Sequence, residues 1–288
     1  MNTIKKVIIP VAGAGTRFLP ATKAQPKEML PIIDKPVVQY IVEEAVASGI
    51  EDVILVTGAS KISIENHFDY NHELQHLLKK QGKEKQRQEV KDIADMANFI
   101  YVRQKGPYGN GTPVLNCRHI IGDDPFAVLW GDELFIGEDK PRLKQLIEAY
   151  EKYTDPVICC QEVDEAGTEK YGIVDGTEVE DDIIQIKDIV EKPGPKKAPS
   201  LIASRSGYIL TPDIFDALEE TKIGKDDELW LVDAIFALSK TRPIYGKKVK
   251  GDIFDTGSKI GWLKANIEFA KRRDDMKDDL EEYLKTII

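Results

Sequence analysis

The sequence predicts an α/β fold with a doubly wound, mainly parallel, Rossmann-like sheet, an irregular β-containing second half and C-terminal helices. Short apolar runs of strand length alternate with segments of helical spacing through the first half. This alternation is typical of βαβ units, whose parallel sheet is covered by helices on both faces. The 288 residues, 42% of them hydrophobic, are enough to bury one large core.

The first half shows this alternation most clearly. The segment Val37–Ala47 has the apolar spacing of a helix, and Gly49 follows it as a C-terminal cap. The apolar runs that predict buried strands in this half are Lys6–Val11, Asp52–Thr57, Phe99–Arg103 and Phe126–Leu129. Between the second and third runs, His72–Met96 is charged and predicts helices on the surface.

The second half is less regular. Its candidate strands are Tyr171–Asp175, Ile183–Glu191 and Ser206–Thr211, and its candidate helices are Pro212–Glu220, Glu228–Ser239 and Gly257–Arg273. We expect a single domain over residues 1–273, with halves of about 1–135 and 136–256. A C-terminal helical segment, 257–288, ends in a charged amphipathic tail whose apolar spacing suits contact with the body or with another copy. The apolar residues are Leu280, Tyr283, Leu284 and Ile287.

Composition and charge limit the classes of partner. The formal net charge is −10, which argues against a nucleic-acid backbone or an anionic membrane as the partner. No apolar stretch approaches the ~18 residues of a membrane span, and Met1–Lys6 is polar rather than signal-like. The three cysteines have neither zinc-site nor disulfide-framework spacing. We therefore expect a cytoplasmic protein.

The strongest chemical signal follows the first predicted strand. Gly13-Ala14-Gly15-Thr16-Arg17 comes directly after it, and Pro26-Lys27-Glu28 follows shortly. Ligands of open α/β sheets bind at the carboxyl ends of strands, where glycines let backbone N–H groups approach phosphate oxygens. Arg17 and Lys27 would supply the positive charge that a triphosphate requires. Phe18 stands where a dinucleotide-binding fingerprint needs its third glycine, and the chain has no Gly-Lys-Ser/Thr of a P-loop.

A second motif has a different interpretation. His72-Glu73-Leu74-Gln75-His76 fits the H-E-x-x-H pattern of zinc proteases, in which two histidines share a helix face. The segment runs directly into a lysine-rich stretch, and no third ligand is evident. We interpret it as a charged surface helix rather than a zinc site.

The stretch that begins at Gly13, GAGTRFLPATKAQPKEMLPIIDKPVVQY, resembles the opening of bacterial UTP–glucose-1-phosphate uridylyltransferases, within the sugar-phosphate nucleotidyltransferase family. Similar blocks follow in the family's order over nearly the whole chain. They are Ser63–Asp69, Val102–Gln104, Gly122–Pro125, Tyr171–Asp175, Val190–Pro193, Ala198–Ser200 and Asp233–Ile235. The resemblance implies transfer of a uridylyl group from UTP to α-D-glucose 1-phosphate, with Mg²⁺ as cofactor and a homodimer or homotetramer as the assembly.

The resemblance also implies roles for individual residues. The nucleotide-binding positions are Ala12, Gly13, Gly15, Thr16, Glu28, Gln104 and Gly109. The catalytic positions are Arg17, Lys27, Asp132 and Lys192. The sugar-binding positions are Gly172, Glu191 and Lys192, and the magnesium ligands are Asp132 and Asp255. Independently, the position of Asp132 just after Phe126–Leu129 predicts that it lies at the same sheet edge as Gly13.

The chain departs from the family pattern at several places, most of them in segments expected near the sugar. These positions are Thr112, Leu201, Ser206, Gly207 and Trp230, and Trp130 also stands where an aliphatic residue is commoner. At Ser206-Gly207 the family usually has Gly-Arg. The departures leave open a different nucleotide, such as dTTP, or a different hexose 1-phosphate. A catalytically silent nucleotide-sugar sensor is the alternative from another class.

Overall fold

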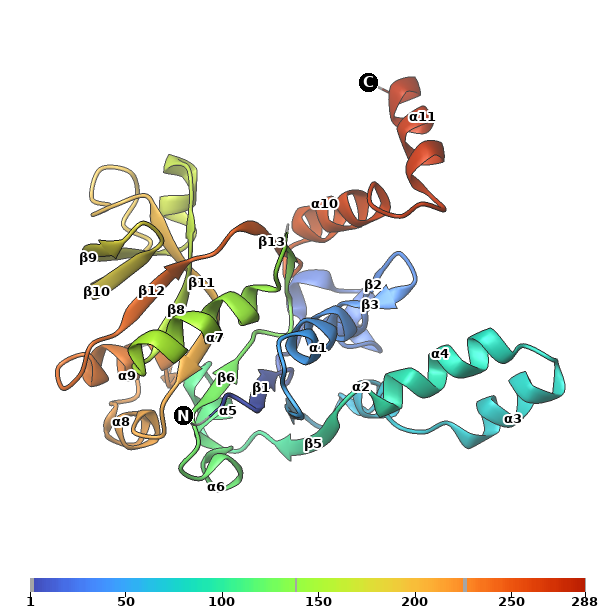
Figure 1. The fold of residues 1–288 in the computed structure, drawn as a ribbon, viewed down its shortest axis with the longest axis horizontal. Helices are drawn as coiled ribbons and strands as arrows, with labels where there is room; N and C mark the ends of the chain where they lie inside the picture. Colours follow the sequence, from blue (N-terminus) through green and yellow to red (C-terminus); the bar gives the residue numbers. More distant parts are fainter. Residues whose placement is uncertain (1–2, 138, 225–226, 288) are drawn as a thin grey trace.

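The computed structural model describes residues 3–137, 139–224 and 227–287, which form a nine-stranded sheet flanked by helices and two small sheets (Figure 1). The strand order of the large sheet is β5-β4-β1-β6-β11-β8-β12-β10-β9. Its first four strands are β1 (Lys6–Pro10), β4 (Asp52–Thr57), β5 (Asn98–Arg103) and β6 (Phe126–Val128). All neighbours among these four are parallel, as the sequence predicts for the first half.

The second half of the sheet has mixed pairing. It contains β8 (Val157–Glu162), β9 (Gly172–Glu180), β10 (Ile183–Glu191), β11 (Ile202–Leu210) and β12 (Tyr245–Lys248). β11 runs antiparallel between β6 and β8, while β12 is parallel to β8 and antiparallel to β10. The small sheets pair β2 (Pro31–Ile32) with β3 (Lys35–Pro36), and β7 (Glu133–Gly137) with β13 (Gly251–Asp255).

Helices cover both faces of the sheet, which confirms the doubly wound arrangement. Along β1, Val7 and Ile9 join one buried apolar cluster, while Ile8 joins the other. The first cluster packs under α1 (Val37–Ala47) and α7 (Arg142–Tyr153). The second cluster packs under α5 (Gly111–Leu115), α8 (Ile214–Glu220) and α9 (Leu231–Leu238). A strand buried on both faces reads as a continuous apolar run, which is the signal in the sequence.

The structure also contains elements that the sequence analysis does not identify. They include α2 (Ile62–His67), α6 (Arg118–Ile121), α7, β7, β8, β12 and β13. The predicted helix Glu228–Ser239 begins at Leu231, because Glu228 forms a β-bridge with Tyr108. The predicted strand Ser206–Thr211 is the second part of the longer β11.

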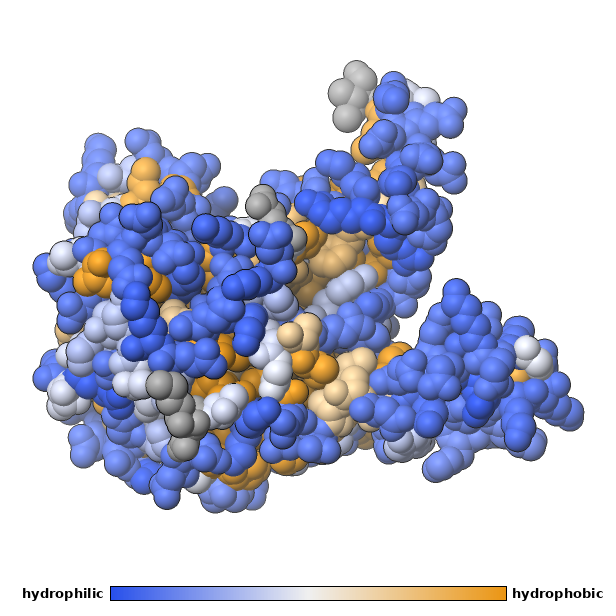
Figure 2. All heavy atoms as spheres, viewed as in Figure 1, coloured by the Kyte–Doolittle hydropathy of each residue, from blue (hydrophilic) through white to orange (hydrophobic). Residues whose placement is uncertain are grey.

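A helical hairpin formed by α3 (His72–Lys80) and α4 (Glu84–Asp95) extends from the body (Figure 1). In Figure 2 it is covered almost entirely by hydrophilic residues, and Leu78 is the buried residue of α3. The hairpin confirms the predicted surface helices. His72 and His76 therefore lie on an exposed helix, in agreement with our interpretation of the H-E-x-x-H motif.

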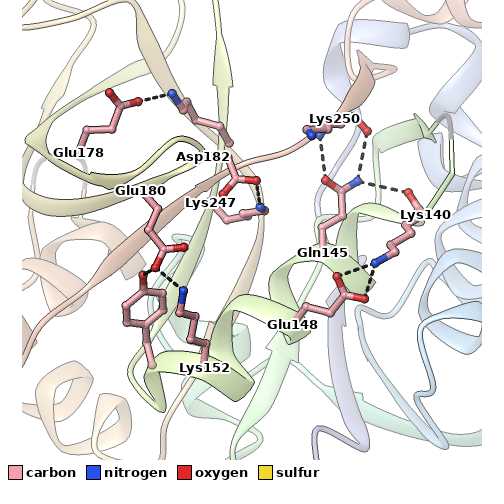
Figure 3. A network of polar contacts seen from close by, with 11 residues as sticks. Lys140, Gln145, Glu148, Lys152, Glu178, Glu180, Asp182, Lys247 and Lys250 are labelled. Atoms are coloured by element: carbon pink, nitrogen blue, oxygen red, sulfur yellow. Dashed lines mark hydrogen bonds and ion pairs between the residues drawn. The ribbon is translucent and has the colours of Figure 1, made fainter.

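Gln145 of α7 fixes the crossover from β12 in the large sheet to β13 in the small one. Its amide nitrogen donates to the backbone oxygen of Lys250 at 3.1 Å, and its amide oxygen accepts from the Lys250 N–H at 2.9 Å (Figure 3). Ion pairs of Lys140 with Glu148 and of Lys247 with Asp182 lie on either side. This contact sets the path of the chain toward Asp255, the last residue of β13.

The C-terminal helices α10 (Lys259–Ala270) and α11 (Lys277–Ile287) extend away from the large sheet (Figure 1). Ile288, the end of the predicted tail, lies outside the described residues. None of the residues of α11 from Lys277 to Ile287 is buried, so this helix does not pack on the body. Among residues 3–137, 139–224 and 227–287, no helix combines the length and apolar composition needed to cross a bilayer.

Arg142 and Glu44 form an ion pair in the interior. The guanidinium of Arg142, at the start of α7, has no exposed side-chain surface and pairs with Glu44 of α1 through two contacts, at 3.1 and 2.8 Å. The same guanidinium donates to the backbone oxygens of Ser206 at 3.1 Å and Glu133 at 3.2 Å. One side chain therefore connects α1, α7, β7 and β11.

We expect Arg142→Leu to lower the free energy of unfolding by about 3–5 kcal/mol, because it leaves the Glu44 carboxylate buried without a partner charge. Urea denaturation followed by circular dichroism measures this change. Lys140→Ala, which breaks the exposed ion pair to Glu148, is the control and should change stability by less than about 1 kcal/mol. An Arg142→Leu protein as stable as this control would contradict the assignment.

Candidate active site

The glycine loop after β1 packs against Lys27. Gly15 has φ of 66°, a left-handed conformation that favours glycine, and a Cβ there would lie 3.3 Å from the Cβ of Lys27. A Cβ on Gly13 would lie 4.0 Å from the Lys27 Nζ. The loop continues into a short 3-10 helix, Thr16–Phe18, and Lys27 begins another, Lys27–Met29. The two segments that carry the sequence motif are therefore in contact.

Lys27 and Asp132 form an ion pair of 2.6 Å across the carboxyl ends of β1 and β6. This contact confirms that Asp132 lies at the same sheet edge as the glycine loop. Burial by itself would lower the pKa of the Lys27 ammonium, but the charges of Asp132 and Glu28 outweigh burial and raise this pKa above its ordinary value. Lys27 is therefore a fixed positive charge at neutral pH.

These groups open onto a cavity of about 440 Å³. The cavity is lined by Gly13–Phe18, Lys27, Asn110, Trp130, Asp132 and Gly257. Of the predicted catalytic residues, Arg17, Lys27 and Asp132 thus lie around one space. Asn110 was not identified from the sequence; it also accepts the backbone N–H of Leu231 at 2.8 Å, which fixes its side chain.

Asp132 and Asp255 converge on one point. A Cβ built on Gly257 would lie 2.8 Å from Oδ2 of Asp132 and 2.9 Å from Oδ1 of Asp255. Magnesium commonly binds one or two carboxylates together with phosphate oxygens and water. One carboxylate oxygen of each of the two aspartates predicted as metal ligands therefore lies next to Gly257, and a side chain at position 257 would clash with both.

The predicted nucleotide-binding residues outside the loop have different surroundings. Glu28 is 1% exposed, and its carboxylate pairs with the buried Lys61 at 2.8 Å. Burial raises the pKa of Glu28, opposed by the positive charges of Lys61 and Lys27. No pattern in the sequence signals Lys61 as its partner. Gln104 follows β5, and its backbone N–H donates to Thr57 at the end of β4, at 3.0 Å.

Gly109 holds the loop after β5 against the segment before α9. Its φ is 114°, and a Cβ would lie 2.2 Å from the backbone oxygen of Leu229, so only glycine fits. The Leu229 N–H donates to Tyr108 at 2.8 Å, and the Gly111 N–H donates to Leu229 at 2.9 Å. The packing against Leu229 therefore explains why glycine is required at position 109, whether or not a ligand binds there.

Gly172, Glu191 and Lys192 come together at the ends of β9 and β10. A Cβ on Gly172 would lie 3.3 Å from a carboxylate oxygen of Glu191, and Glu191 pairs with Lys192 at 2.9 Å. Both charged side chains are more than half exposed. Lys192 has a φ of 46°, an uncommon value for a residue other than glycine. The three predicted sugar-binding residues therefore form one exposed cluster.

Two of the departures from the family pattern are buried in the core. Thr112 and Ser206 are each 1% exposed. The Ser206 hydroxyl accepts the Trp130 N–H at 2.9 Å, and the Ser206 N–H donates to the Glu133 carboxylate at 3.0 Å. Ser206 therefore binds residues on both sides of Asp132: Trp130, two residues before it, and Glu133, one residue after it. Ser206 lies on β11 and supports from within the core the turn that carries Asp132.

Gly207 is packed against α7, whereas the departures at Leu201 and Trp230 are exposed. Gly207 has a φ of 121°, and a Cβ there would lie 3.4 Å from Cδ of Arg142 and 3.0 Å from Leu146. The buried Arg142 side chain therefore lies beside the glycine at position 207. Leu201 and Trp230 are 48% and 37% exposed and lie outside the residues that line the 440 Å³ cavity.

Comparison with known proteins identifies the class. The family model described as nucleotidyl transferase matches residues 6–272, and the chain belongs to this family. The chain is 49% identical over 287 residues to UTP–glucose-1-phosphate uridylyltransferase 2 of Staphylococcus saprophyticus, covering 100% of this chain and 99% of the relative. It is 45% identical over 285 residues to UTP–glucose-1-phosphate uridylyltransferase YngB of Bacillus subtilis, covering 99% and 96%.

Solved structures give the same result. A UDP-glucose pyrophosphorylase complexed with UDP-glucose matches with a TM-score of 0.85 and 42% identity, over 94% of this chain and 100% of that one. A UTP-bound UDP-glucose pyrophosphorylase of Acinetobacter baumannii matches with a TM-score of 0.92 and 37% identity, over 98% and 99%. The family resemblance inferred from the sequence motifs is therefore confirmed.

Proposed function

We propose that this chain transfers the uridylyl group of UTP to α-D-glucose 1-phosphate, giving UDP-glucose and pyrophosphate. The proposal rests on one cavity, which is lined by the glycine loop together with Arg17, Lys27 and Asp132. The names of the relatives, among them a structure that holds UDP-glucose and another that holds UTP, support this choice of substrates. We assign the reaction to one domain, residues 1–273, with a nucleotide-binding half of about 1–135 and a sugar-binding half of about 136–256.

The chemistry requires positioning and charge neutralisation. A phosphate oxygen of glucose 1-phosphate attacks the α-phosphorus of UTP, a new P–O bond forms, and pyrophosphate leaves in line with the bond that breaks. The attacking oxygen is already anionic, so no general base is needed. Lys27 and Arg17 stabilise the negative charge that spreads over the phosphate oxygens. Lys192 binds the phosphate of the sugar 1-phosphate, and Glu191 accepts a hydrogen bond from a sugar hydroxyl.

The nucleotide is held at the carboxyl ends of the parallel strands. Backbone N–H groups of the glycine loop bind the phosphates, with Ala12, Gly13, Gly15 and Thr16 as the predicted contacts. Glu28, Gln104 and Gly109 are the predicted contacts to the base and ribose. Gly172 completes the sugar site by leaving space beside Glu191.

Asp132 and Asp255 would hold a magnesium ion, and their convergence at Gly257 supports this assignment. A bound magnesium ion supplies positive charge to phosphate oxygens. Lys27 pairs with Asp132, so that carboxylate is oriented by the protein itself. Within the described residues no cluster of three or more histidine, cysteine or acidic side chains forms a metal site, so a two-carboxylate site is the arrangement we propose.

The test of the function is pyrophosphate release with magnesium, measured for UTP and dTTP against the 1-phosphates of glucose, galactose and N-acetylglucosamine. We expect turnover with UTP and glucose 1-phosphate. Turnover confined to another pair would retain the mechanism and change the substrates. Nucleotide binding without turnover in any combination would support a sensor instead.

In the same assay Lys27→Ala should lower kcat by about 10²–10³-fold or more, because it removes a preorganised positive charge from the reacting phosphates. Lys23→Ala removes an exposed lysine four residues earlier and is the matched control. Circular dichroism checks that both variants fold. Near-normal turnover by a folded Lys27→Ala enzyme would remove Lys27 from the mechanism.

Gly257→Ala should raise the magnesium concentration for half-maximal rate about tenfold or more, because its methyl group would displace both carboxylates. The measurement is the initial rate against magnesium concentration at saturating substrates. Gly82→Ala, in the exposed turn between α3 and α4, adds the same methyl group at a strained φ of 70° away from the cavity, and it controls for effects on stability alone. An unchanged magnesium requirement would rule out the space beside Gly257 as the metal site.

We also propose that the chain forms a homodimer or homotetramer through α11, and that it acts in the cytoplasm. Tyr283 and Ile287 are 60% and 59% exposed on this helix, and Figure 2 shows apolar atoms among its hydrophilic ones. Contact with another copy would bury this apolar face. The three cysteines are free and buried, which suits a reducing compartment such as the cytoplasm.

The double variant Leu280→Glu and Leu284→Glu should dissociate the oligomer, because it places charges on the apolar face of α11. Light scattering coupled to size-exclusion chromatography should give the 32.4 kDa monomer for the variant and a multiple of that mass for the wild type. Lys285→Glu makes the same change in net charge without removing an apolar residue. Equal masses for the wild type and the double variant would exclude α11 as the interface.

A further inference from the structure

Trp130 occupies a fixed position in the wall of the active-site cavity. It is partly buried, and it lines the same cavity as the glycine loop, Lys27 and Asp132. Its backbone N–H donates to the buried Ser206 hydroxyl at 2.9 Å. Its ring meets the Tyr208 ring edge to face, with centroids 5.6 Å apart and an interplanar angle of 62°. The indole is therefore held from behind by β11 while part of it borders the cavity.

Trp130 is connected to both halves of the proposed site. It is two residues before Asp132, which belongs to the nucleotide side. Its partner Tyr208 lies on β11, and β11 pairs with β9 at Ala203 and Ile173, next to Gly172 of the sugar cluster. A hexose joined to the reacting phosphate must extend from Asp132 toward Gly172 and Glu191. The indole borders the start of that path.

We propose that Trp130 is a stacking platform for the hexose ring of the sugar 1-phosphate, and thereby a residue that determines sugar affinity. This inference rests on the function proposed above. A pyranose ring presents C–H groups on its faces, and placing one face on a rigid indole removes apolar surface of both partners from water. The aliphatic residue that is commoner at this position in the family offers apolar contact without a flat face. Tyr208 and Ser206 keep the indole in place, so little conformational entropy is lost on binding.

The test compares two ligands that differ by the hexose alone, UDP-glucose and UDP, by isothermal titration calorimetry in the presence of magnesium. We expect Trp130→Leu to weaken UDP-glucose binding about tenfold and UDP binding less than about twofold. Trp130→Phe, which keeps a flat ring, should recover most of the loss. Trp230→Leu makes the same chemical change at a tryptophan outside the cavity lining and should leave both affinities unchanged.

A loss shared equally by UDP-glucose and UDP would place the indole against the nucleotide and overturn the proposal. So would unchanged binding of both ligands, which would leave Trp130 a packing residue. A wild-type protein that binds UDP but gains nothing from the glucose would instead contradict the proposed function itself.

A second measurement decides the question if Trp130→Leu does not fold. The chain has three tryptophans, so the double variant Trp230→Phe and Trp262→Phe leaves Trp130 as the sole indole fluorophore. UDP-glucose should then change the fluorescence intensity and emission maximum more than UDP does. Identical spectra with the two ligands would overturn the stacking assignment.

Discussion

The arrangement of the active-site edge depends on the buried Arg142. A fully buried guanidinium is tolerated only when its charge is paired and its N–H groups are bonded, and here Glu44 and two backbone oxygens meet both needs. Those two oxygens belong to Ser206 and Glu133, on the strands behind and beside Asp132. The pair therefore fixes the distance between α1, on one face of the sheet, and the turn that carries Asp132.

Asp132 is held in turn by hydrogen bonds from the residues around Arg142 and from the segment after β13. Ser206 binds the Trp130 N–H and the Glu133 carboxylate, while Thr256 donates its N–H and hydroxyl to the Asp132 backbone oxygen at 2.9 and 2.7 Å. Asp132 is thus held from β11 and from the segment after β13. Lys27 thus keeps its positive charge in a partly buried position, because the Asp132 carboxylate beside it is held in place by the protein and raises the pKa of Lys27.

The sequence predicts those parts of the fold that local patterns encode. Ile8 and Ile54 belong to strands buried on both faces, so their apolar runs are evident, and Asp132 can be placed from the strand that precedes it. The Gly13–Arg17 loop can also be identified locally, because its glycines come directly after the first predicted strand. The partnership of Glu28 with Lys61, and the support of Asp132 by Ser206, join residues far apart in the chain. Such contacts exist only after the sheet has formed, and no spacing in the sequence signals them.

The two sides of the site differ in how they are held. At the glycine loop, Lys27 and Asp132 form a partly buried ion pair, and Glu28 beside them pairs with the buried Lys61, so the positions of these charges are set by folding. On the sugar side, Glu191 and Lys192 form an exposed pair, and such pairs contribute only about 0–1 kcal/mol. In the function proposed above, a phosphate would displace Glu191 from Lys192 at little cost, and the carboxylate would then be free to accept a hydrogen bond from a sugar hydroxyl. Contacts to a substrate could thus replace the Glu191–Lys192 pair, while the buried contacts of Arg142 keep the turn around Asp132 in place.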